Sequence, residues 1–481
     1  MEALTGRLPE DISELKTRMG ESPDFIVREL VLVSQQHMAI FYVDGMVDKP
    51  ALQDSILHPL LHRIAEDNVT LTLLQESILD TGEINLVDSY PNALDQIVAG
   101  DVLLLLEGSA SGLLVAIPGW KDRSIEESKT QSLVRGPQDA FTETLRTNTT
   151  MIRRRIRDTR LRLTNFKIGK ITKTSVTVMY LEGCADATLI ANLTTQLNQI
   201  KVDRIIEGQY LEEILLLDMK PLTIFPRIYN TDRPDVIASG IMEGKIAILT
   251  DGTPFVLMLP ALFTDFIQSA EDYYQTAVYG SLLRLLRYMS LFIGLLAPSI
   301  YIALTTFHQD MLPTQLLLSL AAQREGIPFP AFIEAMLMEI TFEILREAGI
   351  RMPRAVGSAV SIVGTIVIGQ AAVDASIVSP AMVIIVSITA IASFIIPAYT
   401  MSVPVRLLRF FFMGMAAILG VYGLTIGFII LTVHLCSLQS FGIPYMKPVA
   451  PFRKNANRDA IFRFPYRNRK QQTATAKGNK P

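Results

Sequence analysis

The chain has 481 residues, of which 49% are hydrophobic and 19% charged, and its formal net charge is −3 at pH 7. This length predicts more than one domain. Four stretches of at least 19 residues contain no Asp, Glu, Lys or Arg: 288–307, 355–373, 375–405 and 410–446. Since about 20 apolar residues cross a bilayer as a helix, the composition excludes a purely cytosolic protein.

The first 276 residues predict a soluble part on the cytoplasmic side of a membrane. The N-terminal 24 residues are polar and lack the apolar core of a secretory signal peptide. The cysteines Cys184 and Cys436 lie far apart, which predicts no disulfide. His58 and His62 are four residues apart on a predicted helix, but without a third ligand they predict surface histidines. We expect neither a metal nor a cofactor.

A repeat predicts two related α/β subdomains, at 1–127 and 164–276. Residues 38–48 (MAIFYVDGMVD) and 176–186 (VTVMYLEGCAD) share an apolar run, Tyr, an aliphatic residue, an acid, Gly and a final Asp, at an offset of 138. An amphipathic stretch follows each copy. The pattern predicts a strand and then a helix in each subdomain.

Within each copy, the glycine ends the strand and the last Asp caps the helix. These residues are Gly45 and Asp48 in the first copy, and Gly183 and Asp186 in the second. Paired apolar runs predict two hairpins, 102–106 with 113–117 and 246–250 with 255–259, which turn at Gly108 and Asp251-Gly252. The sequence has no glycine-rich phosphate loop, and Glu107 and Asp251 are predicted as turn formers, so this half does not predict an enzyme.

A basic helical connector, 128–163, separates the copies. Seven arginines fall within 17 residues, and only Asp158 offsets them. Three interpretations remain open: a solvated or acid-binding protein face, contact with anionic lipid headgroups, and nucleic acid, which the lack of interleaved aromatic residues disfavours. The candidates for contact with another subunit or with lipid are Arg153, Arg154, Arg155 and Arg157.

Residues 277–446 predict an all-α domain with several membrane spans. Tyrosines and arginines mark its start, and the first span, 288–307, contains Pro298, which predicts a kink. Further spans are predicted at 355–373, 377–396 and within 410–436. The tail 447–481 carries ten Lys or Arg against one Asp, which predicts a basic, disordered, cytoplasmic end.

The segment 328–345 leaves two alternatives open. It is long enough to cross a bilayer, but Glu339 and Glu343 lie on one helical face. The helix either lies in the interface with these acids in water, which we favour, or enters the membrane with them facing a watery or protein-lined interior. An interfacial helix gives four crossings but leaves Arg406 and Arg409 on the outer side, whereas a fifth crossing puts the basic tail outside.

Residues 355–373 are rich in small side chains, which let helices approach closely in lipid. In an oligomer, one face of this helix predicts a pore lined by hydroxyl groups. The opposite face predicts an aliphatic constriction that gates by dewetting. The hydroxyl face carries Ser358, Ser361 and Thr365, and the aliphatic face carries Val360, Val363 and Val367. Ordinary close packing is the alternative.

The chain resembles the A subunit of the GerA-type nutrient germinant receptors of spore-forming bacteria over nearly its whole length. The resemblance is carried by long stretches in the same order, among them LRTNTTMIRRRIRD (145–158), EDYY (271–274), REGIPFPAF (324–332), EILREAGIRMPRAVGSAVSIVGTIVIGQAAV (343–373) and SFGIPY (440–445). Asp232, where the family more often has Glu, is a small departure.

The resemblance implies a receptor component of the inner spore membrane and not an enzyme. Similar proteins assemble with a permease-like B subunit and a lipoprotein C subunit, and nucleic acid is not an implied partner. The A subunit is implied to form a homo-oligomer, a pentamer, that acts as a ligand-gated channel releasing monovalent cations, with helix 355–373 as the pore wall. A secondary transporter is one alternative, although residues 288–446 contain no inverted repeat. A non-conducting scaffold for the permease-like partner is the other.

Overall fold

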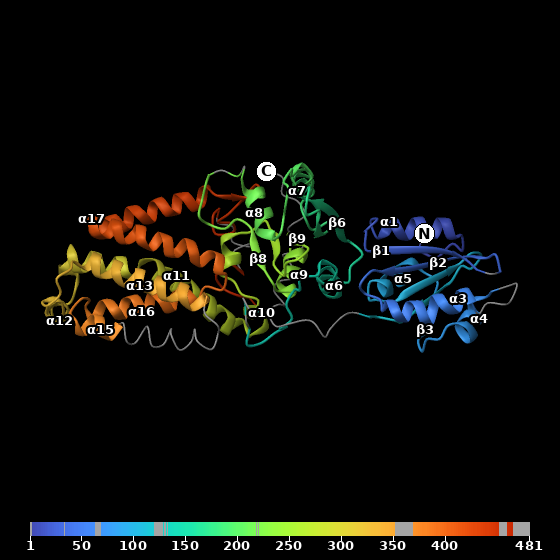
Figure 1. Cartoon of the computed structure of the whole chain (residues 1–481), viewed down its shortest axis with the longest axis horizontal. Coiled ribbons are helices and arrows are strands. Elements are labelled where there is room, and N and C mark those ends of the chain that lie inside the picture. Colours follow the sequence, from blue (N-terminus) through green and yellow to red (C-terminus); the bar gives the residue numbers. More distant parts are fainter. Residues whose placement is uncertain are drawn as a thin grey trace. The chain divides into compact units, whose positions relative to one another are not determined.

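The computed structural model of the chain divides into two compact units (Figure 1). The first comprises mainly Met1–Met219 and Ile228–Pro260, and the second comprises Lys220–Arg227 and Ala261–Lys470. The first unit is built of strands and helices, and the second is almost entirely helical. The structure describes residues 2–32, 34–62, 69–119, 128, 131, 133–217, 219, 221–351, 369–451 and 459–464.

Two five-stranded antiparallel sheets lie in the first unit, and they have the same strand order. The first has the order β1-β2-β4-β5-β3, with β1 (Phe25–Val31), β2 (His37–Val43), β3 (Ile84–Val87), β4 (Val102–Leu106) and β5 (Gly112–Val115). The second has the order β6-β7-β9-β10-β8, with β6 (Leu161–Ile168), β7 (Thr174–Leu181), β8 (Tyr229–Thr231), β9 (Ile246–Thr250) and β10 (Val256–Leu259). Both predicted hairpins are present, as β4–β5 and β9–β10.

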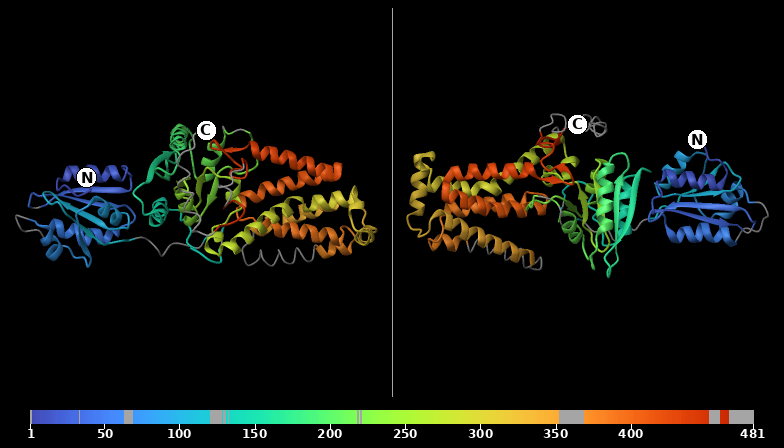
Figure 2. Two further views of the ribbon diagram at one scale, coloured as in Figure 1. Left: turned by 180° about the vertical axis from the view of Figure 1, so that it is seen from behind. Right: turned by 90° about the horizontal axis from the view of Figure 1, so that it is seen from above.

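The helices of this unit pack against the sheets (Figure 2). In the second sheet, α6 and α9 contact β7 and β9, while α7 contacts β6 and α8 contacts β10. The helices are α1 (Leu8–Arg18), α2 (Lys49–Ala51), the π-helical η1 (Leu52–Leu57), α3 (His58–His62), α4 (Leu71–Leu73), the π-helical η2 (Leu74–Ile78), α5 (Tyr90–Ile97), α6 (Leu145–Arg155), α7 (Ala187–Gln199), α8 (Gly208–Leu216) and α9 (Pro234–Met242).

The first sheet is buried on both faces. Ala39 and Phe41 of β2 belong to the core that contains α1 and α5. Met38 and Ile40 belong to the core on the other face, which contains η1 and η2. Because successive side chains point to opposite faces of a sheet, a continuous apolar strand supplies two cores at once.

Carboxylates at repeated positions hold the starts of the helices that follow β2 and β7. Asp48 accepts a hydrogen bond from the backbone N–H of Ala51 at 3.1 Å. Asp186 accepts one from the backbone N–H of Thr188 at 2.8 Å. Both predicted caps are therefore confirmed, and each satisfies a backbone donor that has no partner inside its helix.

Two further carboxylates extend the repeat to the helix that precedes each sheet. Glu107, after β4, accepts from the N–H of Leu8, the first residue of α1, at 3.0 Å. Asp251, after β9, accepts from the N–H of Leu145, the first residue of α6, at 3.1 Å. Glu107 and Asp251, which were predicted as turn residues, therefore also cap helices. Helix α6, in the basic connector, occupies the same position in the second repeat as α1 does in the first.

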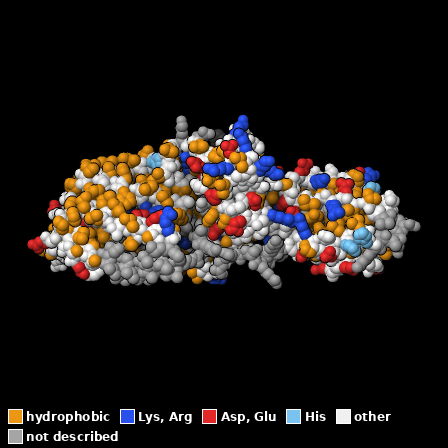
Figure 3. Space-filling view, in the orientation of Figure 1, with side chains coloured by type: hydrophobic (Ala, Val, Ile, Leu, Met, Phe, Trp, Pro, Cys, Tyr) orange, Lys and Arg blue, Asp and Glu red, His pale blue; other side chains and the backbone are white. Residues whose placement is uncertain are grey.

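The second unit consists of helices that contact one another side by side. Two of them, α11 and α17, are long and apolar enough to cross a membrane, and α16 is a shorter apolar helix. Hydrophobic side chains cover most of the visible face of this unit (Figure 3). Its elements are the 3₁₀ turn η3 (Phe263–Phe266), α10 (Glu271–Tyr274), α11 (Ala277–Thr306), the 3₁₀ turn η4 (Gln309–Met311), α12 (Thr314–Arg324), α13 (Ala331–Arg351), α15 (Gly369–Asp374), α16 (Pro380–Phe394), α17 (Tyr399–Ser437), β11 (Gln439–Ser440) and β12 (Ile443–Pro444).

A sharp reversal at Gly420 divides α17 into two arms (Figure 1). Gly420 has φ 57° and ψ −138°, which is outside the helical region. A Cβ built on Gly427 would lie 2.9 Å from the ring of Phe412, so residues on opposite sides of Gly420 are neighbours. The single span predicted within 410–436 is therefore, in the structure, a helical hairpin that begins at Tyr399.

We expect Gly420→Ala to destabilise this hairpin by about 1–3 kcal/mol, because the backbone conformation is one that only glycine adopts readily. A Cβ there would also lie 2.7 Å from the imidazole of His308. Gly414→Ala is the matched control, since a Cβ on Gly414 meets nothing within 4 Å. The melting temperatures of the two variants in detergent measure the difference, and equal values would contradict the assigned turn.

Candidate functional site: ion pairs between the apolar helices

Helix α13 carries its acids into the interior of the helical unit. Glu334 and Glu339 are both 0% exposed, and the Glu343 side chain is 25% exposed. The interfacial interpretation of 328–345, with these acids in water, does not fit this burial. The burial fits the alternative, in which the acids face a protein-lined interior. Arginines from neighbouring helices supply the counter-charges that buried carboxylates require.

Glu339 of α13 forms a fully buried ion pair with Arg409 of α17. Oε2 of Glu339 lies 2.5 Å from Nη1 of Arg409, whose side chain is 1% exposed. Nε of Arg409 donates a second hydrogen bond, at 2.7 Å, to the backbone carbonyl of Gly294 in α11. Pro298, four residues after Gly294, has no N–H, so it leaves this carbonyl without its helical partner. The guanidinium replaces that partner and joins three helices.

Glu343 accepts from two arginines on different helices. One is Arg346, one turn farther along α13. The other is Arg406 of α17, whose Nη1 lies 2.9 Å from Oε2 of Glu343. Arg406 and Arg409, which the four-crossing alternative leaves on the outer side, have partners inside the helical unit.

Glu334 ties the start of α13 to the start of α16. Its Oε2 accepts from the backbone N–H of Ser379 at 3.0 Å and from the hydroxyl of Ser379 at 2.9 Å. The same hydroxyl accepts from the N–H of Met382 as the cap of α16, at 3.3 Å. Arg324, at the end of α12, lies 3.2 Å from Oε1 of Glu334. Sequence reasoning missed this acid, although a Ser-Pro pair before an apolar run signals the helix start that it supports.

The three acids thus connect α11, α13, α16 and α17 through polar contacts in otherwise apolar surroundings. Oε1 of Glu339 and Nη2 of Arg409 have no hydrogen-bond partner among the described residues. Polar atoms left unsatisfied in an apolar interior are costly. Carboxylates at such depth are typical of ion paths.

The predicted pore wall lies outside the described residues. This applies to all six candidates, Ser358, Ser361, Thr365, Val360, Val363 and Val367.

The arginines of the basic helix have different surroundings. Arg153 is 1% exposed and binds Asp24, which precedes β1, through Nε at 2.8 Å and Nη2 at 3.0 Å. Arg155 pairs with Asp139 at 2.5 Å. Arg153 therefore joins the two repeats and is not available to lipid or another subunit, whereas Arg157 is exposed.

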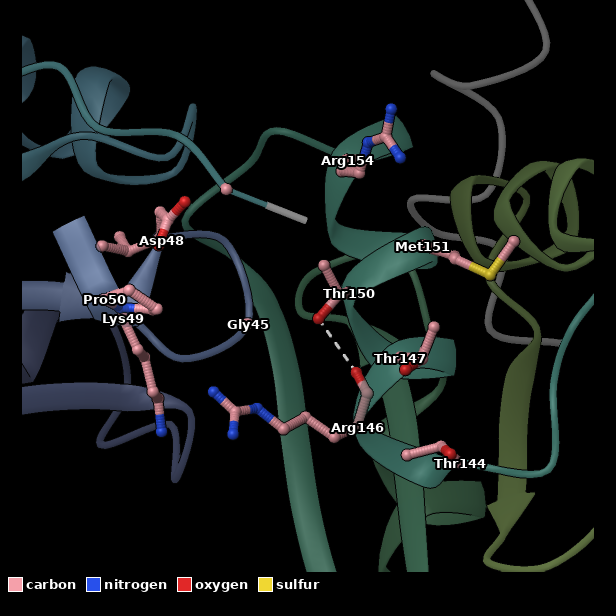
Figure 4. Close-up of a pocket in the computed structure, with 12 residues that line it drawn as sticks. Gly45, Asp48, Lys49, Pro50, Thr144, Arg146, Thr147, Thr150, Met151 and Arg154 are labelled. Carbon is pink, nitrogen blue, oxygen red and sulfur yellow. Dashed lines mark hydrogen bonds between the residues drawn. The ribbon is translucent and has the colours of Figure 1, made fainter. Parts of the chain in front are cut away.

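A pocket of about 530 Å³ lies where α6 meets the turn after β2 (Figure 4). Arg146, Thr150 and Arg154 line it from α6, and Asp48 and Lys49 line it from the first repeat. Three of the lining side chains, Lys49, Arg146 and Arg154, are cationic and one, Asp48, is acidic. No sequence pattern indicates this pocket, because its two sides are about a hundred residues apart in the chain and meet only when the two repeats pack together.

A buried acid on α8 is expected to make stability depend on pH. Glu212 is 7% exposed and one of its oxygens lacks a partner among the described residues. Burial, and secondarily the charge of Glu207, raises the pKa of Glu212 from 4.5 to about 7. The unfolded chain then releases this proton at lower pH than the folded chain does. Stability is unaffected below pH 4.5, falls as the pH rises to about 7, and stays lower above it.

We therefore expect Glu212→Gln to stabilise the first unit at pH 8, by up to about 3 kcal/mol, and to have little effect at pH 4. Glu213→Gln changes the neighbouring exposed carboxylate and serves as the control. Thermal melts of both variants between pH 4 and 8 measure the effect. A gain for Glu212→Gln that is the same at every pH would exclude this explanation.

No group of three His, Cys, Asp or Glu side chains within the described ranges is arranged to hold a metal ion. The rings of His58 and His62 lie 4.7 Å apart, and no third ligand joins them in that part of the chain.

The family described as "Bacillus/Clostridium GerA spore germination protein" matches residues 13–475 of the chain. Spore germination protein KA of Bacillus subtilis (strain 168) is 46% identical, over 95% of this chain and 85% of that protein. Spore germination protein GerLA of Bacillus cereus is 36% identical, over 96% of this chain and 94% of that protein. The crystal structure of the N-terminal domain of the A subunit of the Bacillus megaterium spore germinant receptor GerK3 is 35% identical, with a TM-score of 0.44, and covers 55% of this chain and 98% of that one.

Proposed function

Because the chain belongs to the GerA family of spore germination proteins, we propose that it forms, as a homo-oligomer, a ligand-gated channel that releases monovalent cations at the start of germination. The observation that carries this proposal is the set of buried carboxylates on α13 inside an apolar helical unit. Such groups are expensive in hydrocarbon and are typical of ion pathways. The relatives are germination proteins, and nothing in the family match points to an enzyme.

The proposed location is the inner membrane of the spore, with several crossings and the N-terminal half in the cytoplasm. Contacts within the second unit support an even number of crossings. Residues before and after the helices meet at one end: the N–H of Phe263 donates to the carbonyl of Tyr445 at 2.9 Å, and Arg284, near the start of α11, binds Asp459 at 3.0 Å. A chain that returns to the side where it entered has crossed an even number of times, which favours a cytoplasmic C-terminus.

The proposed partners are a permease-like B subunit, which holds the nutrient, and a lipoprotein C subunit. The proposed oligomer is a pentamer, in which helix 355–373 lines the pore. Nutrient binding opens such a channel only through its higher affinity for the open state. A secondary transporter and a non-conducting scaffold for the permease-like subunit are the competing functions.

Reconstitution of the purified chain in liposomes separates these three functions. We expect flux of potassium without flux of nutrient. Exchange of solute would instead indicate a transporter, and a well-formed oligomer that conducts nothing would indicate a scaffold. Val363→Ala is expected to increase ion leak, because the smaller side chain widens the aliphatic constriction and lowers its barrier to water and ions. Val433→Ala, at a side chain that is 64% exposed on α17, is the matched control.

A further inference from the structure

A short loop of the second unit, residues 221–227, exposes two aliphatic side chains. Leu222 is 93% exposed and Ile224 is 49% exposed. Phe225, the next residue, is only 6% exposed. The loop therefore packs one apolar side chain inward and holds two outward, which is an unfavourable arrangement in water.

Contacts with the last turn of α17 fix the position of this loop. The hydroxyl of Thr223 lies 2.9 Å from Nε2 of His434, and the rings of Phe225 and His434 are 6.2 Å apart. After α17, the hydroxyl of Ser440 donates to the carbonyl of Arg227 at 2.7 Å. Leu222 and Ile224 are thus presented from a backbone that is anchored to the end of a helix.

The end of α17 to which the loop is attached carries an exposed apolar face. Ile426, Ile429, Ile430 and Val433 recur at helical spacing and are between 44% and 64% exposed. If α17 crosses the bilayer as the proposed function requires, this face contacts acyl chains. His434 follows directly on it, so the loop lies where that apolar face ends.

We propose that residues 221–225 form an interfacial anchor, in which Leu222 and Ile224 insert into the lipid at the membrane border on the side of the loop. This inference rests on the proposed membrane function and adds a lipid contact from outside the helices. Lipid that covers the loop at this depth removes its exposed apolar surface from water, which is favourable. The anchor fixes the depth of α17 through Thr223 and His434.

Tryptophan fluorescence of the full chain tests the anchor. Trp120→Phe removes the single tryptophan, and Leu222→Trp, Ile171→Trp or Ile430→Trp then places one probe in each protein. Ile171 is 77% exposed in the first unit and is the control for an exposed aliphatic side chain without lipid contact. Ile430 is the reference for α17 in lipid. Each protein is reconstituted in vesicles of phosphatidylglycerol and brominated phosphatidylcholine.

We expect Leu222→Trp to emit at shorter wavelength and to be quenched by the brominated lipid, while Ile171→Trp is not. Quenching of Ile430→Trp without quenching of Leu222→Trp would overturn the anchor and leave the membrane function intact. A blue shift of Leu222→Trp without quenching would also overturn it, because a protein surface then covers the loop. Absence of quenching at Ile430 would overturn both proposals.

Discussion

Glu339→Gln is expected to lower the stability of the helical unit by about 3–5 kcal/mol, since it leaves the guanidinium of Arg409 buried without a counter-charge. The amide keeps the shape of the side chain, so the loss reports charge and not volume. Glu347→Gln is the control on the same helix: its side chain is 59% exposed and pairs with Arg351 across one turn. Such surface pairs contribute at most about 1 kcal/mol. Melting temperatures in detergent give both values.

A second pair of variants tests the link to Pro298. Arg409→Lys keeps the charge but loses the planar fork that reaches Glu339 and the carbonyl of Gly294 together. Pro298→Ala restores an N–H four residues after Gly294, so the carbonyl regains its helical partner. We expect Arg409→Lys to cost less in the Pro298→Ala background than in the natural chain. Additive effects of the two changes would refute the assigned role of Arg409.

In the liposome assay, we expect Glu339→Gln also to lower ion flux.

Arg153→Met is expected to destabilise the first unit by about 3–5 kcal/mol, because it leaves the Asp24 carboxylate without its counter-charge at the contact between the repeats. Arg157→Met is the matched control, since Arg157 lies exposed just beyond the end of the same helix. The double variant Asp24→Leu with Arg153→Met removes both charges and should recover most of the loss. Chemical denaturation of the full chain in detergent measures the three variants.

The opposite pattern would assign Arg153 a different role. If Arg157→Met is the more damaging change, or if the double variant is worse than Arg153→Met alone, the ion pair with Asp24 does not join the repeats. Binding to anionic vesicles offers an independent comparison. Only the Arg157 side chain, of these two, is accessible to lipid headgroups, so Arg153→Met should leave such binding unchanged.

The local features of the repeat were predictable from the sequence because they depend on neighbouring residues. An apolar run followed by an acid, Gly and Asp specifies a strand, a turn and a capped helix within a dozen positions. Asp48, Asp186 and the two hairpins follow from such short signals. The equivalence of α1 and α6 was not visible, because these helices share only a capping arrangement that comes from a distant turn.

The helical unit was harder to predict because its charges have long-range partners. Glu339 and Arg409 are 70 residues apart in the chain, so the residues next to either of them in the sequence do not indicate the pair. The signals that were present are indirect: an arginine within an apolar segment, and a proline that frees a carbonyl on another helix. Gly420 was equally inconspicuous, because glycines are common in membrane helices, and within α17 only this glycine has a non-helical backbone conformation.

The reversal at Gly420 also sets the dimensions of the helical unit. As one straight rod, the 39 residues of α17 would extend about 58 Å, nearly twice the hydrocarbon thickness of a bilayer. Folded back at Gly420, the same residues give two rods of about 32 and 26 Å, each close to that thickness. In the proposed membrane arrangement, a segment that hydropathy predicts as one overlong helix therefore crosses the lipid twice and brings its end back to the side from which it started.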